Sequence, residues 1–142
     1  MSPVLPDFGG LEIGQIVATK EINLERADLV RYAGASGDFN PIHWNDTFAV
    51  GVGLESVIAH GMLTMGTAVT LVEAWVGDQR AIVDYQARFS RQVSVPNPGA
   101  AELTLTATVG HLDPDTRRVR LDLNALCDGA RVLAKAQVVV QL

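Results

Sequence analysis

The stretch from Gly61 to Val76 constrains the fold of this chain more than any other segment. Its apolar side chains recur at helical spacing and leave almost no polar face. They are Met62, Leu63, Met65, Val69, Leu71, Val72 and Trp75. A helix that is apolar nearly all round has to be covered nearly all round. The rest of the chain must therefore supply a surface that wraps around one helix.

The segments that follow this helix alternate with a period of two, which is typical of half-buried β-strands. Their apolar phases are Val83, Tyr85, Ala87 and Phe89; Leu103, Leu105, Ala107 and Val109; Val119, Leu121, Leu123, Ala125 and Cys127; and Val132, Ala134, Ala136, Val138 and Val140. Residues 113–115 and 128–129 predict turns between strands. Before the central helix, residues 15–22 predict a strand and residues 25–33 a short helix that stops near Gly34 and Gly37. We predict an α+β fold, one antiparallel sheet around one helix.

Length and composition limit the classes of protein to consider. We expect residues 1–142 to form a single domain, with residues 1–10 as a loose leader. The formal net charge of −5 argues against a general nucleic-acid binder. The uncharged apolar run 57–72 falls short of the ~20 residues of a membrane span, so we expect no membrane partner. A single cysteine excludes an internal disulfide and favours a reducing, cytoplasmic compartment.

The segment from Tyr32 to His43 carries the residues suited to chemistry. Asp38 and His43 are five residues apart in a loop that Pro41 keeps from becoming helical. The imidazole can move a proton near neutral pH, the carboxylate can hold water or a hydroxyl group, and Asn40 can fix the loop through Asx-type bonds. Taken singly, such an Asp is often only a turn former and such a His only a core residue.

The combination of motifs resembles a known family. The segment 32–43, followed five residues later by Ala49, is similar to the hydratase signature of the MaoC-like family, and residues 58–66 resemble that family's entry into its central helix. These proteins are (R)-specific enoyl-thioester hydratases and (3R)-hydroxyacyl dehydratases with a hotdog fold. Within the family, residues 40–44, 59–66, 75–78 and 93–98 most resemble the catalytic B-type subunit of (3R)-hydroxyacyl-ACP dehydratases of fatty acid elongation.

The resemblance implies roles for individual residues. Asp38 and His43 become the catalytic pair, Asn40 supports them, and the backbone N–H of Gly61 receives the thioester oxygen. Charge collects on that oxygen when the α-proton leaves, and an N–H at a helix start can stabilise it. We expect His43 to handle the α-proton and Asp38 the β-hydroxyl or water, with the reverse assignment left open.

Other polar residues receive plainer expectations. His60 is expected to cap the central helix or to fix the loop, Cys127 to be an inert core residue, and His111 to lie on the surface. We expect neither a metal nor a cofactor, because Asp38 and His43 have no third ligand nearby in the sequence.

Two alternative functions and a set of partners remain. A non-catalytic hotdog subunit could bind an acyl chain for a partner, and a hotdog thioesterase would use an acid on the central helix, where Glu73 is the only one. The expected substrate is an acyl-CoA or acyl-ACP thioester. Candidate residues for a basic patch that receives the carrier are Arg88, Arg91, Arg117, Arg118 and Arg120. We expect a homodimer, or a heterodimer with a homologous subunit, whose contact surface includes Leu126, Leu133, Val139, Ala81 and Ile82.

Overall fold

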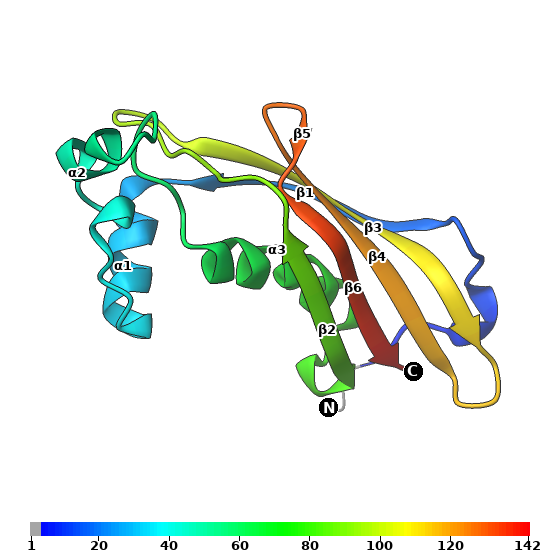
Figure 1. Ribbon diagram of the computed structural model, residues 1–142. Coiled ribbons are helices and arrows are strands. Elements are labelled where there is room, and N and C mark those ends of the chain that lie inside the picture. The colour runs from blue at the N-terminus through cyan, green and yellow to red at the C-terminus, as the bar shows by residue number, and fades with distance from the viewer. Residues whose placement is uncertain (1–3) are drawn as a thin grey trace.

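A computed structural model describes residues 4–142 of the chain. Six antiparallel strands form one sheet in the order β1-β3-β4-β6-β2, and the short β5 pairs with β4. The sheet curves around α3, as Figure 1 shows. The strands are β1 (Ile16–Leu24), β2 (Ile82–Phe89), β3 (Ala101–Asp113), β4 (Arg118–Cys127), β5 (Ala130–Arg131) and β6 (Leu133–Gln141). This is the predicted α+β hotdog arrangement, and the prediction is confirmed.

The central helix α3 runs over Gly61–Val76, the bounds that its apolar pattern predicts. It ends where Gly77 adopts a left-handed conformation with φ of 75°, which glycine tolerates well. Two shorter helices lie beyond one end of α3 (Figure 1). The helices are α1 (Arg26–Ser36) and α2 (Asp46–Gly51), with 3-10 turns η1 (Phe8–Gly10), η2 (Pro41–His43) and η3 (Gln79–Ala81). Within residues 4–142, no helix is long and apolar enough to cross a membrane.

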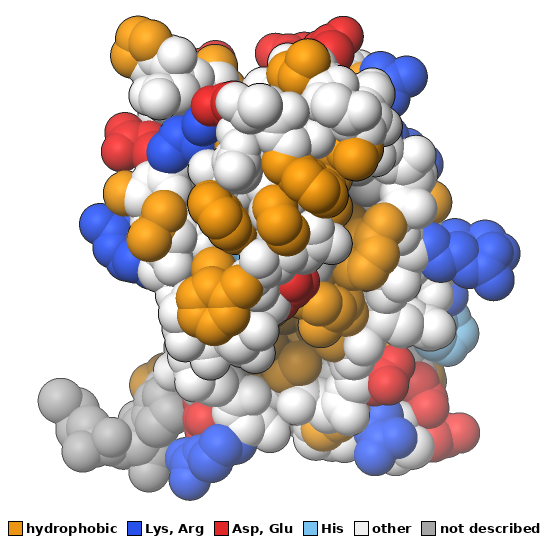
Figure 2. Space-filling view, turned by 60° about the vertical axis from the view of Figure 1, so that its left-hand side comes forward, with side chains coloured by type: hydrophobic (Ala, Val, Ile, Leu, Met, Phe, Trp, Pro, Cys, Tyr) orange, Lys and Arg blue, Asp and Glu red, His pale blue; other side chains and the backbone are white. Residues whose placement is uncertain are grey.

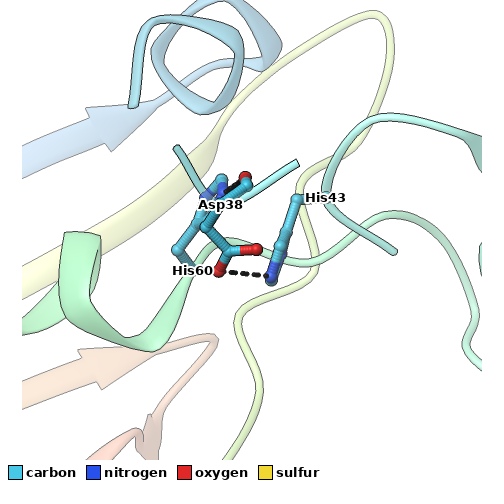
Figure 3. Close-up of side chains that lie close together, drawn as sticks. All are labelled: Asp38, His43 and His60. Carbon is cyan, nitrogen blue, oxygen red and sulfur yellow. Dashed lines mark hydrogen bonds and ion pairs between the residues drawn. The ribbon is translucent and has the colours of Figure 1, made fainter. Parts of the chain in front are cut away.

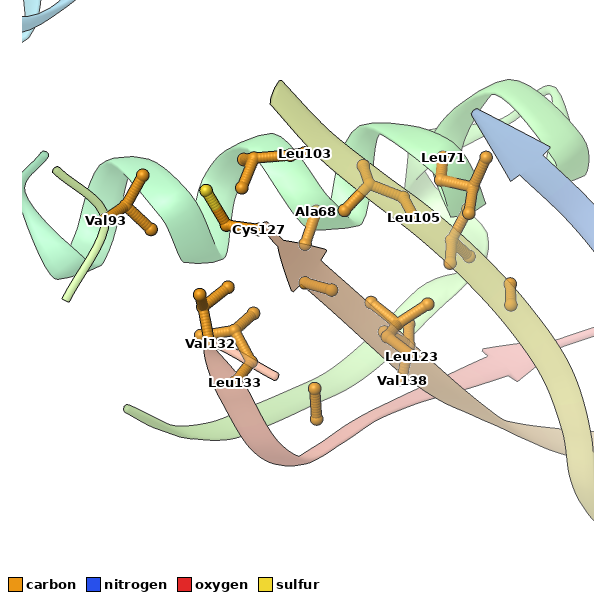
Figure 4. Packing of buried hydrophobic residues seen from close by; sticks show 14 of the residues in the cluster. Ala68, Leu71, Val93, Leu103, Leu105, Leu123, Cys127, Val132, Leu133 and Val138 are labelled. Atoms are coloured by element: carbon orange, nitrogen blue, oxygen red, sulfur yellow. The ribbon is translucent and has the colours of Figure 1, made fainter. Parts of the chain in front are cut away.

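The core lies between α3 and the concave face of the sheet (Figure 4). Ala68, Leu71 and Val72 of α3 are buried in one hydrophobic cluster with alternate residues of β3 and β4. Leu103, Leu105 and Ala107 on β3 and the matching positions Leu121, Leu123 and Ala125 on β4 are all at most 8% exposed. The predicted inward phases of these two strands are confirmed, as is the burial of Cys127, where burial raises the pKa of the thiol.

Two β-bulges change which side chains of β2 and β6 face the core. On β2, Val83 is the extra residue between the pairs Ile82–Val140 and Asp84–Val139, and it is 47% exposed where the alternation predicts burial. On β6, an extra residue near Lys135, whose φ is 47°, turns Leu133 inward. Leu133, expected on the outward contact surface, is only 1% exposed. One inserted residue reverses the alternation of a strand, and this explains both differences.

The burial of other residues also differs from what was expected of the contact surface and of the leader. Ala81 is 8% exposed and belongs to the core, so only Ile82, Leu126 and Val139 of the expected surface are even partly exposed. Phe8, expected within a loose leader, packs partly against the core, and the Arg117 guanidinium lies 5.7 Å from the centre of its ring. The first three residues of that leader lie outside the described part of the chain.

Candidate active site

The loop after α1 is fixed by its own polar side chains. Gly37 ends α1 in the left-handed region, with φ of 76°, and turns the chain toward Asp38. The Asp38 Oδ1 accepts a hydrogen bond from the backbone N–H of Asn40 at 3.2 Å. The Asn40 Oδ1 in turn accepts the N–H of Ile42 at 3.2 Å and caps η2. The second bond is of the Asx type predicted for Asn40, and neither bond uses the Oδ2 of Asp38.

His43 is held in one tautomer that presents a free nitrogen to Asp38. Its Nδ1 lies 2.7 Å from the carbonyl oxygen of Ile58, which can only accept, so Nδ1 carries the proton and donates. The opposite nitrogen, Nε2, lies 3.8 Å from Asp38 Oδ2 (Figure 3). The His43 side chain is 9% exposed and the Asp38 side chain 51%. The structure thus brings together the two residues predicted to form the acid–base pair.

A cavity of about 290 Å³ joins His43 to the start of α3. Its lining includes His43, Gly61, Thr64, Phe89 and Arg91. Gly61 is the first residue of α3, so its N–H has no acceptor within the helix. A Cβ at Gly61 would lie 3.2 Å from the Phe89 ring, so the cavity is narrow at this point.

Asp38 is not among the residues that line this cavity, and its Oδ2 lies beside the Nε2 of His43, which does line it. In Figure 2, apolar side chains gather around a hollow on the end of the molecule turned forward. Among the described residues, several large apolar side chains are exposed in segment 39–52 and at the start of α3. They are Phe39, Trp44, Phe48, Val50, Val52 and Met62.

His60 lies in this cluster with Asp38 and His43. It occupies the N-cap position of α3 without a side-chain capping bond, so the expected capping role is wrong. Its Nε2 instead donates to the backbone oxygen of Asp38 at 3.1 Å, which is the alternative expectation of fixing the loop. Burial lowers the pKa of His60, the Asp38 carbonyl opposes that change, and the neighbouring His43 lowers the pKa further. His60 is therefore a neutral imidazole near pH 7.

The fold brings a third potential metal ligand, His60, close to Asp38 and His43. Ligand atoms of Asp38, His43 and His60 all lie within 4.8 Å of one another. The two imidazole rings, however, are stacked with centroids 3.8 Å apart and planes at 22°. Lone pairs in nearly parallel ring planes do not converge on one ion at the ~2.0–2.1 Å that zinc requires. The cluster is therefore poorly shaped for a metal, and the expectation of metal-free chemistry stays a prediction.

Arg26 links three segments that are distant in the chain. Arg26 of α1 makes a bidentate pair with Asp46 at 2.9 Å and donates from Nε to the carbonyl of Val95 at 2.8 Å. The Arg26 guanidinium lowers the pKa of Asp46. The contacts join α1, α2 and the segment that pairs with Val57. The Arg and Asp are 20 positions apart, so no local motif could have revealed them.

The fold and the site together define a class of protein. A helix start with a free N–H, an imidazole and a carboxylate lie together beside the hotdog sheet, and this set of groups can move protons on a carbonyl compound. The sequence comparisons agree with this class. The profile described as MaoC like domain matches residues 9–123, and the chain belongs to this family.

Relatives and solved structures share the sequence and the fold. The chain is 39% identical over 75 residues to 3-hydroxyacyl-thioester dehydratase X of Mycobacterium tuberculosis, covering 53% of this chain and 26% of that protein. It is 28% identical to the (R)-specific enoyl-CoA hydratase of Rhodospirillum rubrum, covering 75% and 74%. A solved MaoC-like dehydratase superposes with a TM-score of 0.94 at 36% identity, over 99% of this chain and 43% of that one. The (R)-hydratase from A. caviae superposes with a TM-score of 0.82 at 27% sequence identity, over 94% of this chain and 98% of that one. The chain thus spans about a quarter of the first relative's length.

Proposed function

We propose that this chain is a hydro-lyase that interconverts (3R)-hydroxyacyl and trans-2-enoyl thioesters. In this proposal the chain forms a single hotdog domain and acts in the cytoplasm. The observation that carries the proposal is the His43 Nε2, free to take a proton, 3.8 Å from Asp38 Oδ2 and in one cavity with Gly61. The names of the dehydratase and hydratase relatives support the same reaction. The resemblance to the B-type dehydratase subunit supports a place in fatty acid elongation.

The dehydration can be written with one proton shared by the pair. His43 Nε2 takes the α-proton from C2 while the C–O bond at C3 breaks, and the departing hydroxyl group takes the proton that the pair supplies through Asp38 and leaves as water. The pair then holds an imidazolium and a carboxylate, and the proton returns from His43 to Asp38 across 3.8 Å. The reverse sequence hydrates the enoyl thioester. The bond from His43 Nδ1 to Ile58 holds the ring in place in both protonation states.

The negative charge that builds up in this reaction collects on the thioester oxygen. The N–H of Gly61, at the positive end of a 16-residue helix, is available to receive it. A preorganised donor of this kind is often the largest single contribution to rate in reactions of carbonyl compounds. Gly61 therefore has the role of oxyanion donor in the proposal.

The two alternative functions lack comparable support. A non-catalytic acyl-binding subunit has no need of a carboxylate and an imidazole held in fixed orientations. A thioesterase acid at Glu73 is 12 residues from Gly61, which is about 18 Å along an α-helix. Glu73 therefore lies far from the cavity that contains His43.

One assay separates the three functions. Crotonyl-CoA is incubated with the protein while enoyl absorbance and free thiol are followed together. A hydro-lyase lowers the absorbance without releasing thiol, a thioesterase releases thiol, and an acyl-binding subunit does neither. Longer enoyl thioesters in the same assay, with this chain alone and with co-purifying partners, define the chain length accepted.

We expect Arg91 to contact the phosphate of the carrier arm. Arg91 lines the cavity with His43 and Gly61, and within residues 4–142 its guanidinium has no ion pair. Arg91→Ala should raise KM for crotonyl-CoA about fivefold, the effect of ~1 kcal/mol for an exposed charge pair. KM for the phosphate-free crotonyl-N-acetylcysteamine should not change. Lys20→Ala, on the exposed side of β1 at the opposite edge of the sheet, is the control. An equal KM change with both thioesters would contradict the contact.

The edge of the sheet at β2 favours a second hotdog unit as a partner. β2 ends the strand order, so its outer backbone groups have no strand to pair with among the described residues. Val83 and Phe89 on β2 are 47% and 53% exposed, and Met62 on α3 is 57% exposed. Exposed apolar edge strands pair with other chains. We propose a dimer through this edge, either with a second copy or with a homologous subunit.

Light scattering on the purified chain tests the dimer. We expect a particle of at least twice the 15.2 kDa chain mass, because isologous pairing is the common way to cover such an edge. Val83→Lys should weaken the association by placing a charge in the contact, whereas Val30→Lys, on the exposed side of α1, should not. A stable and fully active monomer would overturn this part of the proposal.

A further inference from the structure

His60 is a buried titratable residue to which the proposed reaction gives no task. It is 2% exposed and lies directly before Gly61. Its Nε2 faces a carbonyl oxygen, so the proton sits on Nε2, and the lone pair of Nδ1 is buried without a partner. An unpartnered buried acceptor lowers stability and calls for an explanation. The stability of the fold alone does not explain why histidine occupies this position.

We propose that His60 is a positioning residue that holds the acid–base pair and the oxyanion donor in one rigid unit. This inference rests on the proposed function of Asp38, His43 and Gly61. His60 contacts the backbone of Asp38 and the ring of His43, and it is joined to Gly61 by a peptide bond (Figure 3).

The first contact fixes the backbone of Asp38. The Asp38 side chain is half exposed and its Oδ1 is bonded only to the neighbouring Asn40 N–H, so the loop depends on bonds to its backbone. The Nε2–H of His60 supplies one from 22 residues away. A local Asx turn sets the shape of the loop, whereas this long-range bond sets its distance from α3.

The second contact fixes the ring plane of His43. The His60 ring is stacked on the His43 ring, with centroids 3.8 Å apart. The ring of Tyr32 on α1 packs against the His60 ring, with centroids 4.7 Å apart and planes at 59°. The bond from His43 Nδ1 to Ile58 is a single pivot about which the imidazole can tilt. A neutral ring against its face removes that freedom and, when His43 accepts a proton, presents π electrons to the imidazolium.

The third contact is covalent. His60 is the residue before Gly61, and its carbonyl accepts the N–H of Thr64 at 3.1 Å, which starts α3. The His60 side chain binds the Asp38 backbone, and the His60 carbonyl carbon is bonded to the nitrogen that carries the Gly61 N–H. A shift of the loop relative to the helix changes the distance from acid to base and from base to oxyanion donor together.

Substitutions can separate the two side-chain contacts. His60→Gln retains a donor for the Asp38 carbonyl and loses the stacked ring. His60→Phe retains the ring, loses the donor and removes the unpartnered Nδ1. His60→Ala loses both contacts. His111→Ala is the control, because His111 is exposed on β3.

Kinetics with crotonyl-CoA give the main readout. We expect His60→Ala to lower kcat by about 10- to 100-fold, the range for misplacement of reacting groups, with KM changed less than about threefold. His60→Gln and His60→Phe should each recover part of that loss, and His60→Phe should melt no lower than His60→Gln. Wild-type kcat in a folded His60→Ala protein, or a kcat for both partial variants no better than that of His60→Ala, would overturn the proposal.

A second readout does not depend on the reaction. In histidine-labelled protein, the ¹⁵N spectrum of His43 should show one sharp set of signals in the wild type and broadened or doubled signals in His60→Ala and His60→Gln. Unchanged His43 signals in both variants would show that the stack does not hold the ring. An inactive wild-type protein with the expected spectra would instead count against the proposed reaction alone.

Discussion

Asp38→Asn and His43→Ala should each lower kcat by ~10²–10⁴, the usual contribution of a positioned proton donor or acceptor. In Asp38→Asn, an amide oxygen can still accept the N–H of Asn40, so the loop keeps its shape while the carboxyl group that gives and takes a proton is lost. His43→Ala leaves the buried carbonyl of Ile58 without its donor. His43→Asn restores an N–H at that position and separates the loss of chemistry from a loss of stability.

The measurement is kcat for hydration of crotonyl-CoA, together with thermal unfolding of each variant. Asp115→Asn, in the exposed turn between β3 and β4, is the matched control and should behave like the wild type. Hydration at a near-normal rate in a folded Asp38→Asn or His43→Asn protein would remove that residue from the mechanism.

Gly61→Pro should lower kcat by ~10²–10³ relative to Gly61→Ala, the typical effect of removing one oxyanion donor. Both variants add a Cβ against the Phe89 ring at 3.2 Å, but only proline removes the N–H. The backbone tolerates the change, because proline is favoured at the first position of a helix. His60, which would precede it, already has the extended φ and ψ of −58° and 133° that such a residue adopts.

The pair of variants makes the test of the N–H specific. Thermal unfolding shows whether both proteins remain folded, and the ratio of their kcat values reports the donor. Equal kcat values in folded Gly61→Pro and Gly61→Ala would show that the thioester oxygen does not bind this amide.

The parts of the fold with a strong local pattern could be predicted from the sequence. Helix α3 has an apolar surface over its whole length and a glycine at its end, so both bounds of Gly61–Val76 follow from the chain itself. From Ala101 to Val109 on β3 and along β4 the period of two is unbroken, and the buried faces of these stretches were predicted. Asp38, Asn40 and His43 share one loop, so their proximity is also a local property.

The features that were missed depend on contacts distant in the chain. The bulges at Val83 and near Lys135 are set by pairing between β2 and β6, and neither strand alone shows where the extra residue falls. His60 reaches the acid–base pair through a bond across 22 residues and a stack on His43. A histidine just before the glycine at a helix start was the available signal, and its direction could not be read from the sequence.

Hydration of crotonyl-CoA in D₂O, followed by NMR and chiral analysis of the product, tests the acid–base account most directly. The account predicts (3R)-3-hydroxybutyryl-CoA that carries one deuteron at C2, because the proton delivered to C2 comes through exchangeable groups of Asp38 and His43. The Asp38→Asn, His43→Asn double variant should form almost none of it. Crotonate and free CoA as products, the 3S alcohol, or full activity in the double variant would contradict the account.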